Sequence, residues 1–315
     1  MARDVKGYLN QLLQMYWLRP ETALWRCFDC LLMDHVPITG NSIDLGCGDG
    51  ILSYIIAGGQ IHNYDVFLDV EQLQDYNNGA DIYNSSTCRQ LESDETFLRH
   101  RFSYGVDHKT GLIEKAKRLG GFYDRTMVHD LNLPLPFPES HFDTAFSNIL
   151  YWLNDLNDVL SDWNRVLKRS GRLILFVPNE NFRERAWLYY SAPHQGDNKY
   201  LNFFDRGYAG LVQHCYSSAR WLELFVKNGF KVVKHRSYVT DPVISIWNIG
   251  TRPIASLLIS MANKLSVDDR RLVKCEWVEY FEKFCLPIVE GECNREPEDS
   301  AAAFHFYVLE KQGCA

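Results

Sequence analysis

The chain has 315 residues, of which 46% are hydrophobic and 23% charged, an ordinary balance for a globular protein with one large core. Its formal net charge of -7 gives no general positive field to attract a phosphate backbone, which argues against a nucleic-acid partner. The longest apolar run, residues 254–262, is well short of the roughly 20 residues that span a bilayer. We therefore expect no transmembrane segment and a cytoplasmic location.

Two helices are predicted within residues 1–40. Apolar and aromatic side chains recur at helical spacing over residues 8–36, and Pro20 suits the first turn of a helix. Cys27 and Cys30 share one helical face, which predicts two buried free thiols. This helical segment is expected to precede a main domain over residues 41–315.

Strands and helices alternate after residue 41. The predicted strands cover residues 42–45, 102–106, 126–128, 142–146, 172–177, 230–238 and 304–309, and the predicted helices between them cover residues 51–57, 111–118 and 156–167. Such alternation predicts an α/β fold with a doubly wound, mostly parallel sheet of seven strands, in which the last two strands pair at one edge.

Three stretches break the alternation and are interpreted as insertions, at about residues 58–101, 178–217 and 241–300. Segments longer than about 15 residues between elements are usually functional or structured in their own right. They are the expected places for substrate recognition. Residues 254–265, in the last insertion, could form a lid or the interface of a homo-oligomer.

A glycine-rich turn joins the first predicted strand to the helix that follows it. Asp44 ends the strand, and Gly46, Cys47, Gly48 and Gly50 follow. Glycine permits positive φ and lets backbone amides approach a ligand, and a carboxylate at the strand end can pair with a cationic group. The G-x-G-x-G spacing differs from the G-x-G-x-x-G of dinucleotide sites.

This turn resembles the first motif of the class I S-adenosylmethionine-dependent methyltransferases. The resemblance runs in order over about residues 42–178 and again over about 216–239. It implies a Rossmann-like fold with S-adenosylmethionine as cofactor and S-adenosylhomocysteine as product. The glycine turn, Cys47 included, would hold the methionine end of the cofactor, with Asp44 near its amino group and residues 1–40 covering the site.

The ribose ligand has two candidates. In this family an acidic residue at the end of the second strand binds the ribose hydroxyls, because a carboxylate can accept both hydrogen bonds. Asp107, followed by His108 and a predicted helix, is our choice, although it lies 63 residues after Asp44 (107 - 44). Asp65 is the rival at 21 residues (65 - 44), close to the usual spacing of about 20. Choosing Asp107 makes residues 58–101 an insertion.

Two further segments are similar to family motifs. Asp130 and Leu131 precede a proline-rich stretch and would contact the adenine, Asp130 by accepting from the exocyclic amine and Leu131 by packing on the ring. Asn148 follows the predicted strand 142–146, whose end would face the transferred methyl group.

A general base, if the reaction uses one, is expected between the fifth strand and the late helix. His194, Asp205 and His214 lie there among several aromatic residues, and the two histidines are the candidates for catalysis. His129 is a weaker candidate because it adjoins the adenine motif. The ten histidines are dispersed and lack a helical H-E-x-x-H arrangement, so no metal is predicted.

The predicted activity is methyl transfer to a small-molecule acceptor, at a hydroxyl of a sugar, a glycan end or an aromatic natural product. The alternatives are a protein or amine N-methyltransferase, which an acidic chain could suit, and a catalytically inactive scaffold that binds S-adenosylmethionine. A fold by itself does not name a substrate.

Overall fold

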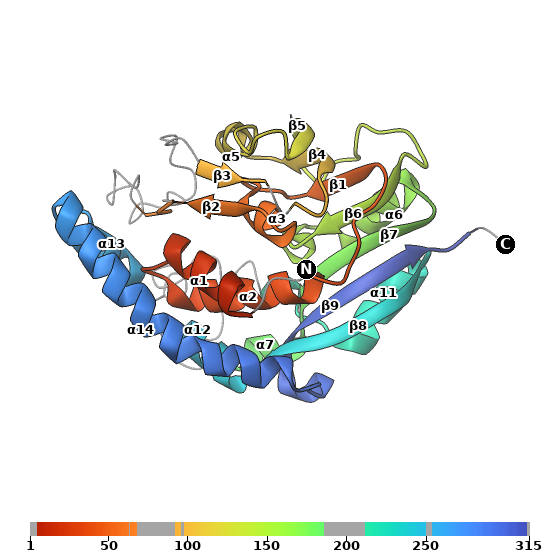
Figure 1. Cartoon of the computed structure of the whole chain (residues 1–315). Coiled ribbons are helices and arrows are strands. Elements are labelled where there is room, and N and C mark those ends of the chain that lie inside the picture. The colour runs from red at the N-terminus through yellow and green to blue at the C-terminus, as the bar shows by residue number, and fades with distance from the viewer. Residues whose placement is uncertain are drawn as a thin grey trace.

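The computed structural model describes residues 5–62, 64–67, 92–95, 98–185, 212–249 and 254–313. At its centre is a seven-stranded sheet with the order β5-β4-β1-β6-β7-β9-β8 (Figure 1). The strands are β1 (Ser42–Leu45), β4 (Phe102–Asp107), β5 (Tyr123–Val128), β6 (Phe142–Ser147), β7 (Leu167–Pro178), β8 (Phe230–Thr240) and β9 (Ala302–Lys311). Strand β9 runs in the direction opposite to the other six strands of this sheet. The predicted mostly parallel α/β sheet is confirmed.

Helices cover both faces of the sheet, and a hydrophobic core lies between the helices and each face. On one face lie α3 (Ile51–Ile56) and α5 (Thr110–Ala116), which belong to the larger of two hydrophobic cores. On the other lie α6 (Leu156–Val166) and α11 (Ser218–Lys227), whose Trp163 and Trp221 are fully buried in the second core. This is the doubly wound arrangement that the sequence predicts.

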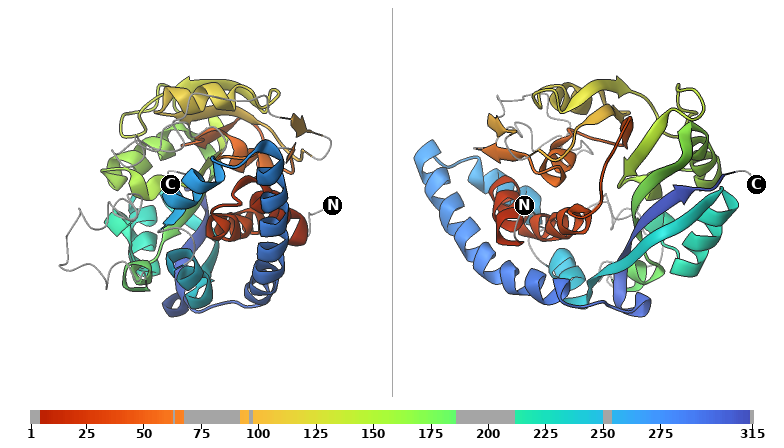
Figure 2. Two further views of the ribbon diagram at one scale, coloured as in Figure 1. Left: turned by 90° about the vertical axis from the view of Figure 1, so that its left-hand side faces the viewer. Right: turned by 45° about the vertical axis from the view of Figure 1, so that its right-hand side comes forward.

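The two expected N-terminal helices are α1 (Val5–Met15) and α2 (Pro20–Met33). Pro20 stands at the start of α2, and Cys27 and Cys30 are buried free thiols, as expected. Helix α1 packs on α2 and on α14 (Val267–Cys293), and α2 also contacts α3 and β8. Figure 2 shows this red helix pair lying between the long blue helix α14 and the sheet.

Residues 241–300 are mostly helical. They comprise α12 (Asp241–Ile249), α13 (Ala255–Ala262), α14 and the short helix η5 (Asp299–Ala301). Helix α13 buries Ile259 but leaves Leu257 and Met261 about two-thirds exposed, at 64% and 66%. Helix α13 therefore presents an apolar face to solvent, as either a lid or an interface would.

The remaining short elements flank the sheet. A separate antiparallel pair, β2 (Gln60–His62) and β3 (Glu92–Asp94), brings the two sides of the segment at 58–101 together. After β6 and β7 come η2 (Leu150–Trp152) and α7 (Glu180–Arg185), and η3 (Val212–His214) precedes α11. No helix among the described residues is long and apolar enough to cross a membrane.

Strand β7 begins earlier than predicted, at Leu167 instead of residue 172. The pairing with β6 jumps from Leu167 to Arg172, so residues 168–171 bulge out of the sheet. Ser170 has a positive φ of 60°, and a Cβ at Gly171 would lie 2.8 Å from the Lys168 carbonyl oxygen. A glycine is required there for steric reasons, and the apolar periodicity resumes only after it.

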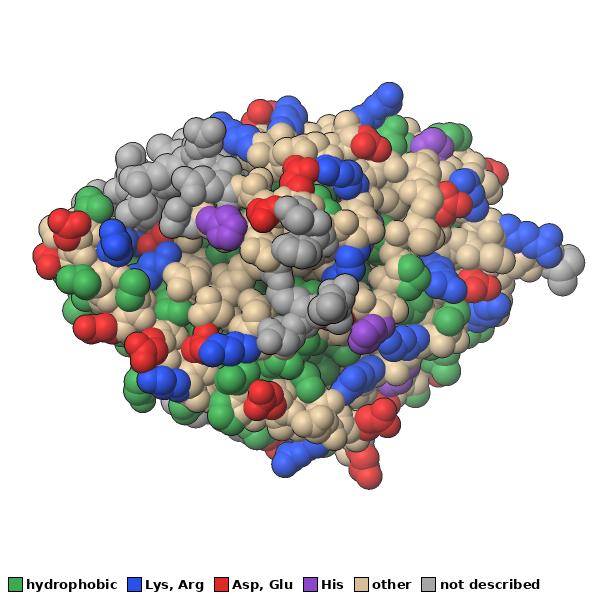
Figure 3. Space-filling view, in the orientation of Figure 1, with side chains coloured by type: hydrophobic (Ala, Val, Ile, Leu, Met, Phe, Trp, Pro, Cys, Tyr) green, Lys and Arg blue, Asp and Glu red, His purple; other side chains and the backbone are tan. Residues whose placement is uncertain are grey.

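Acidic and basic side chains are interspersed on the face that Figure 3 shows. No continuous basic area covers the described part of that face. This agrees with a formal net charge of -7.

Candidate active site

The carboxyl ends of four parallel strands meet at one edge of the sheet. Leu45 is paired with Val106, and Asp107 with Val128, so the turn after β1 lies beside the ends of β4 and β5. The amides of Gly46 and Cys47 both donate to the Val106 carbonyl oxygen, at 2.8 and 2.9 Å. In open α/β sheets a ligand binds at this edge, where the strand order reverses.

The glycine turn has the conformation that the sequence predicts. Gly46, Gly48 and Gly50 all have positive φ, at 84°, 59° and 77°. A Cβ at Gly46 would lie 2.1 Å from the Ile149 side chain, and one at Gly50 would lie 2.7 Å from Tyr123. A Cβ at Gly48 would meet no atom within 4 Å. Gly46 and Gly50 are thus demanded by packing, whereas Gly48 borders open space in which the chain can receive a ligand.

Asp44 is a buried carboxylate at the end of β1. Its side chain accepts a 2.7 Å hydrogen bond from the Tyr123 hydroxyl, and the residue is 2% exposed. Burial raises the pKa of Asp44 to about 6, against hydrogen bonds from Ser53 and Tyr123 that lower it. A neighbouring cation would relieve this unfavourable burial of negative charge.

Asp107 lies beside the glycine turn. Its Oδ2 accepts from the Gly48 amide at 3.1 Å and its Oδ1 from the Lys109 amide at 2.9 Å, while the side chain is still 11% exposed. His108 lies next to it, with Nδ1 3.6 Å from Oδ1. The two amides fix the carboxylate at the strand end.

Asp65, the rival to Asp107, has other partners. Its Oδ2 accepts from Trp17 Nε1 at 2.8 Å and from the Arg270 guanidinium at 2.9 Å. Both side chains of the Asp65–Arg270 ion pair are under a tenth exposed. Asp65 thus links the segment after β2 to α14 and is not at the sheet edge.

The proposed adenine residues follow β5. Asp130 is exposed, and its Oδ1 accepts from both the backbone and the side-chain nitrogen of Asn132 at 2.9 Å. These hydrogen bonds lower the pKa of Asp130, so the side chain is a carboxylate near neutral pH. Leu131 is buried, and the His129 amide donates to the Asp107 carbonyl oxygen at 3.0 Å. This pairing brings Asp130 near the end of β4.

Asn148 comes directly after β6 and is half-buried. The preceding Ser147 hydroxyl donates to the Leu45 carbonyl oxygen at 2.8 Å, which ties the end of β6 to the start of the glycine turn. Gly48, Asp107 and Asn148 thus lie at or just after the ends of three neighbouring strands.

His214 is buried and both of its ring nitrogens have partners. Nε2 lies 2.8 Å from the Leu153 carbonyl oxygen, and Nδ1 lies 2.9 Å from the Tyr216 hydroxyl. A carbonyl oxygen can only accept, so we assign the ring proton to Nε2, with Nδ1 accepting from Tyr216. His214 therefore has no free lone pair for proton transfer in this conformation. His194 and Asp205 lie outside the described residues.

A buried group on α2 escaped the sequence interpretation. Arg26 Nη1 donates to Asp29 Oδ2 at 2.9 Å, and the Asp29 Oδ1 accepts from the Tyr238 hydroxyl at 3.0 Å. Burial raises the pKa of Asp29, and Arg26 and Tyr238 oppose that rise. The one signal in the sequence is the i,i+3 pair of opposite charges inside an otherwise apolar helix.

Arg26 extends this group to the glycine turn. Burial raises the pKa of Asp49, and Arg26 is among the groups that lower it, so the two side chains are close. Arg26 also interacts with the hydroxyls of Tyr16 and Tyr151, the latter on η2 after Asn148. The Arg26 side chain is 34% exposed, although Asp29 is almost fully buried.

Residues 86–175 match a family model described as a methyltransferase domain. The match begins within the segment at 58–101 and ends within β7, so in the seven-stranded sheet it covers β4, β5, β6 and most of β7. No curated protein matches the chain.

Several solved structures are similar in outline. An S-adenosylmethionine-dependent methyltransferase from Mesorhizobium loti is 13% identical, with 91% of this chain and 97% of that one covered and a TM-score of 0.48. A geranyl diphosphate methyltransferase in complex with S-adenosylmethionine is 13% identical, with 93% and 90% covered and a TM-score of 0.44. The cyclase SpnF is 14% identical, with 94% and 83% covered and a TM-score of 0.47.

The sheet order and the glycine turn at its switch point define a Rossmann-like fold, and the family match places a methyltransferase domain within it. The match assigns residues 86–175 to a methyltransferase domain, for which S-adenosylmethionine is the expected methyl donor. The open space at Gly48 and the carboxylates of Asp44 and Asp107 fit a ligand that carries an ammonium group and a ribose.

Proposed function

We propose that the enzyme transfers the methyl group to a hydroxyl of a small polar acceptor, such as a sugar, a glycan end or a hydroxylated natural product. The observation that carries this proposal is the Arg26–Asp29 pair with the Tyr151 and Tyr238 hydroxyls, beside the cofactor turn. Fixed donors and acceptors in a buried setting are suited to a polyhydroxy ligand, whose hydroxyls both donate and accept. We call these four side chains the acceptor wall.

The cofactor would be held by the residues at the sheet edge. We assign the methionine end to the turn of Gly46, Cys47, Gly48 and Gly50, with the ammonium group near Asp44. Asp107 would accept from the ribose hydroxyls, with His108 beside it. The support is geometric, since these residues adjoin the space at Gly48.

We assign the adenine to the exposed Asp130, whose second oxygen has no partner in its turn with Asn132, and to the neighbouring Leu131. Asn148, at the end of β6, would face the reacting end of the cofactor. When bound, the cofactor supplies a methyl group on a positively charged sulfur, which requires in-line approach by the acceptor oxygen. The chain then contributes mainly positioning.

A base that accepts the acceptor's proton is assigned to His194, on the segment between β7 and α11. His214 is assigned a positioning role, because its Nε2 proton holds the Leu153 carbonyl and thereby the loop that follows Asn148. Replacing His194 by Gln should lower kcat most at neutral and higher pH, where the histidine of the wild-type enzyme is neutral and can accept a proton. A kcat unchanged in the variant at every pH would contradict the assignment.

The experiment that tests the proposed function is an acceptor panel with labelled S-adenosylmethionine. The panel contains sugars and glycans, phenolic natural products, amines and peptides. We expect label in a hydroxylated small molecule. Label confined to amines or peptides, or no turnover at all by a protein that binds the cofactor, would overturn the proposal.

The acceptor wall has its own test. Arg26→Gln should raise the acceptor KM about 10- to 100-fold, as loss of a charge-assisted hydrogen bond of about 1.5–3 kcal/mol implies, while the S-adenosylmethionine Kd stays constant. Arg220→Gln, at an exposed position on α11, is the matched control. Because Arg26→Gln leaves Asp29 buried without its cation, Tyr238→Phe serves as a milder second variant. Normal KM values in both variants would remove these residues from the acceptor site.

A further inference from the structure

A cluster of possible metal ligands lies on the β8–β9 strand pair, on residues that the proposed function does not use. His235 and Ser237 on β8 point to the same side of the sheet, and Ser237 is paired with His305 on β9. Asp299, on η5 just before β9, completes the cluster. One ligand atom from each of His235, Asp299 and His305 lies within 4.8 Å of the other two.

The spacing of the two imidazoles is close to that around a metal ion. His235 Nε2 and His305 Nδ1 are 3.1 Å apart. In a tetrahedral zinc site with Zn–N bonds of about 2.0–2.1 Å, two ligand nitrogens are separated by about 3.3 Å. A small movement of either ring would therefore let one ion bind both nitrogens.

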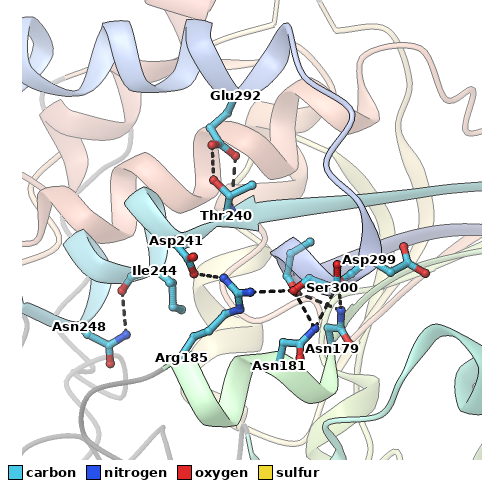
Figure 4. A network of polar contacts seen from close by, with 11 residues as sticks. Asn179, Asn181, Arg185, Thr240, Asp241, Ile244, Asn248, Glu292, Asp299 and Ser300 are labelled. Carbon is cyan, nitrogen blue, oxygen red and sulfur yellow. Dashed lines mark hydrogen bonds and ion pairs between the residues drawn. The ribbon is translucent and has the colours of Figure 1, made fainter.

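The second observation is that the carboxylate is already oriented. The Ser237 hydroxyl donates to Asp299 Oδ1, and the same hydroxyl oxygen lies 3.0 Å from His305 Nδ1. Asp299 is also fixed through its backbone, because its carbonyl oxygen accepts from Asn179 Nδ2 at 2.7 Å. Figure 4 shows this support. The side chains of Asn181 and Arg185, on α7, and of Asn179, just before α7, donate hydrogen bonds to backbone carbonyl oxygens of residues 299–300.

All three side chains are of types that bind transition metals. An imidazole binds through the lone pair of a ring nitrogen, and a carboxylate binds through an oxygen. His235 is exposed, so an ion can reach the cluster from solvent.

We propose that His235, Asp299 and His305 bind a single transition-metal ion, with zinc the best-matched ion, and that the ion fastens η5 to the β8–β9 strand pair. Two imidazole nitrogens and one carboxylate favour zinc and its neighbours over magnesium or calcium, which prefer oxygen ligands alone. With three protein ligands, the fourth position is left to water. The ion would hold the connection from α14 into β9, and it takes no part in methyl transfer.

The test uses the full chain, freed of any affinity tag, stripped with a chelator and dialysed. Titration with Co²⁺ should produce the visible absorption of a tetrahedral site at one equivalent, and Zn²⁺ should displace it. His235→Gln and Asp299→Asn should each weaken binding about 100-fold or more, whereas His129→Gln, a histidine outside the cluster, should leave it unchanged.

His235→Gln is the informative variant, because its exposed side chain can be replaced without opening the core, whereas His305 is fully buried. Circular dichroism establishes that each variant is folded. Absence of a cobalt spectrum and of zinc binding in the wild-type chain would overturn the proposal. Binding that persists in both His235→Gln and Asp299→Asn would overturn it equally.

Discussion

Replacing Asp44 by Asn should stabilise the protein without cofactor while weakening cofactor binding. Burial raises the pKa of Asp44 from 3.8 to about 6, so at pH 7.5 the folded protein carries a carboxylate in an unfavourable site. A difference of this size corresponds to about 3 kcal/mol of lost stability. Asn retains one acceptor oxygen for the Tyr123 hydroxyl but loses the hydrogen bond from Ser53, at a cost of about 1 kcal/mol. The net gain expected at pH 7.5 is about 2 kcal/mol.

The pH dependence gives the sign of the effect independently. Because the pKa is raised on folding, the carboxyl group costs no stability below about pH 4, and its full cost is present only above about pH 6. Urea unfolding of both proteins without cofactor should therefore show Asp44→Asn as the more stable at pH 7.5 and as slightly the less stable near pH 4. The reasoning is refuted if the stability difference has the same sign and size at both pH values.

Three further predictions concern the same edge of the sheet. Gly48→Ala should weaken S-adenosylmethionine binding, measured by titration calorimetry, more than tenfold, because its methyl group enters the open space at the turn. Gly121→Ala is the control: Gly121 also has a positive φ, and a Cβ there would meet only Arg101, at 3.9 Å. This control should lose the same stability of about 1 kcal/mol through its backbone but bind the cofactor normally. Asp107→Asn should raise the Kd about 10- to 100-fold and the exposed Asp124→Asn should not, and equal Kd values would exclude Asp107 as the ribose ligand. Asp65→Asn should leave the Kd unchanged but lower the urea midpoint, because it leaves the buried Arg270 without its anionic partner. A large loss of cofactor affinity at normal stability would instead support Asp65 as the ribose ligand.

The elements that could be predicted from sequence are those with local signals. Strand β1 has the predicted bounds. Helix α6 has the predicted start and ends one residue before the predicted end. Its local signals are Asp155, which caps its start, and the apolar periodicity along it. The glycine turn was predictable for the same reason, since its three glycines need positive φ whatever surrounds them. The start of β7 was not, because the bulge at residues 168–171 depends on the pairing with β6.

Residues whose roles come from tertiary contacts could not be predicted. His235 and His305 are 70 residues apart and meet only because β8 and β9 pair across the helices α12 to α14. In the sequence, Arg26 and Asp29 are two opposite charges within one turn of an apolar helix. Their place in a larger polar group is visible only in the structure, where Asp29 accepts from the hydroxyl of Tyr238, more than 200 residues away. His214 was a reasonable candidate by composition, and only the structure shows that Leu153 and Tyr216 engage its ring.

The acceptor wall and the cofactor turn are held by different parts of the chain. The turn is fixed by the sheet, through the amides of Gly46 and Cys47 on Val106. The wall is fixed by α2, which packs on β8, α12 and α14. Arg26, in the wall, also acts electrostatically on Asp49 in the turn. Changes in the helices of residues 241–300 should therefore shift the acceptor KM through α2 and leave the S-adenosylmethionine Kd unaltered.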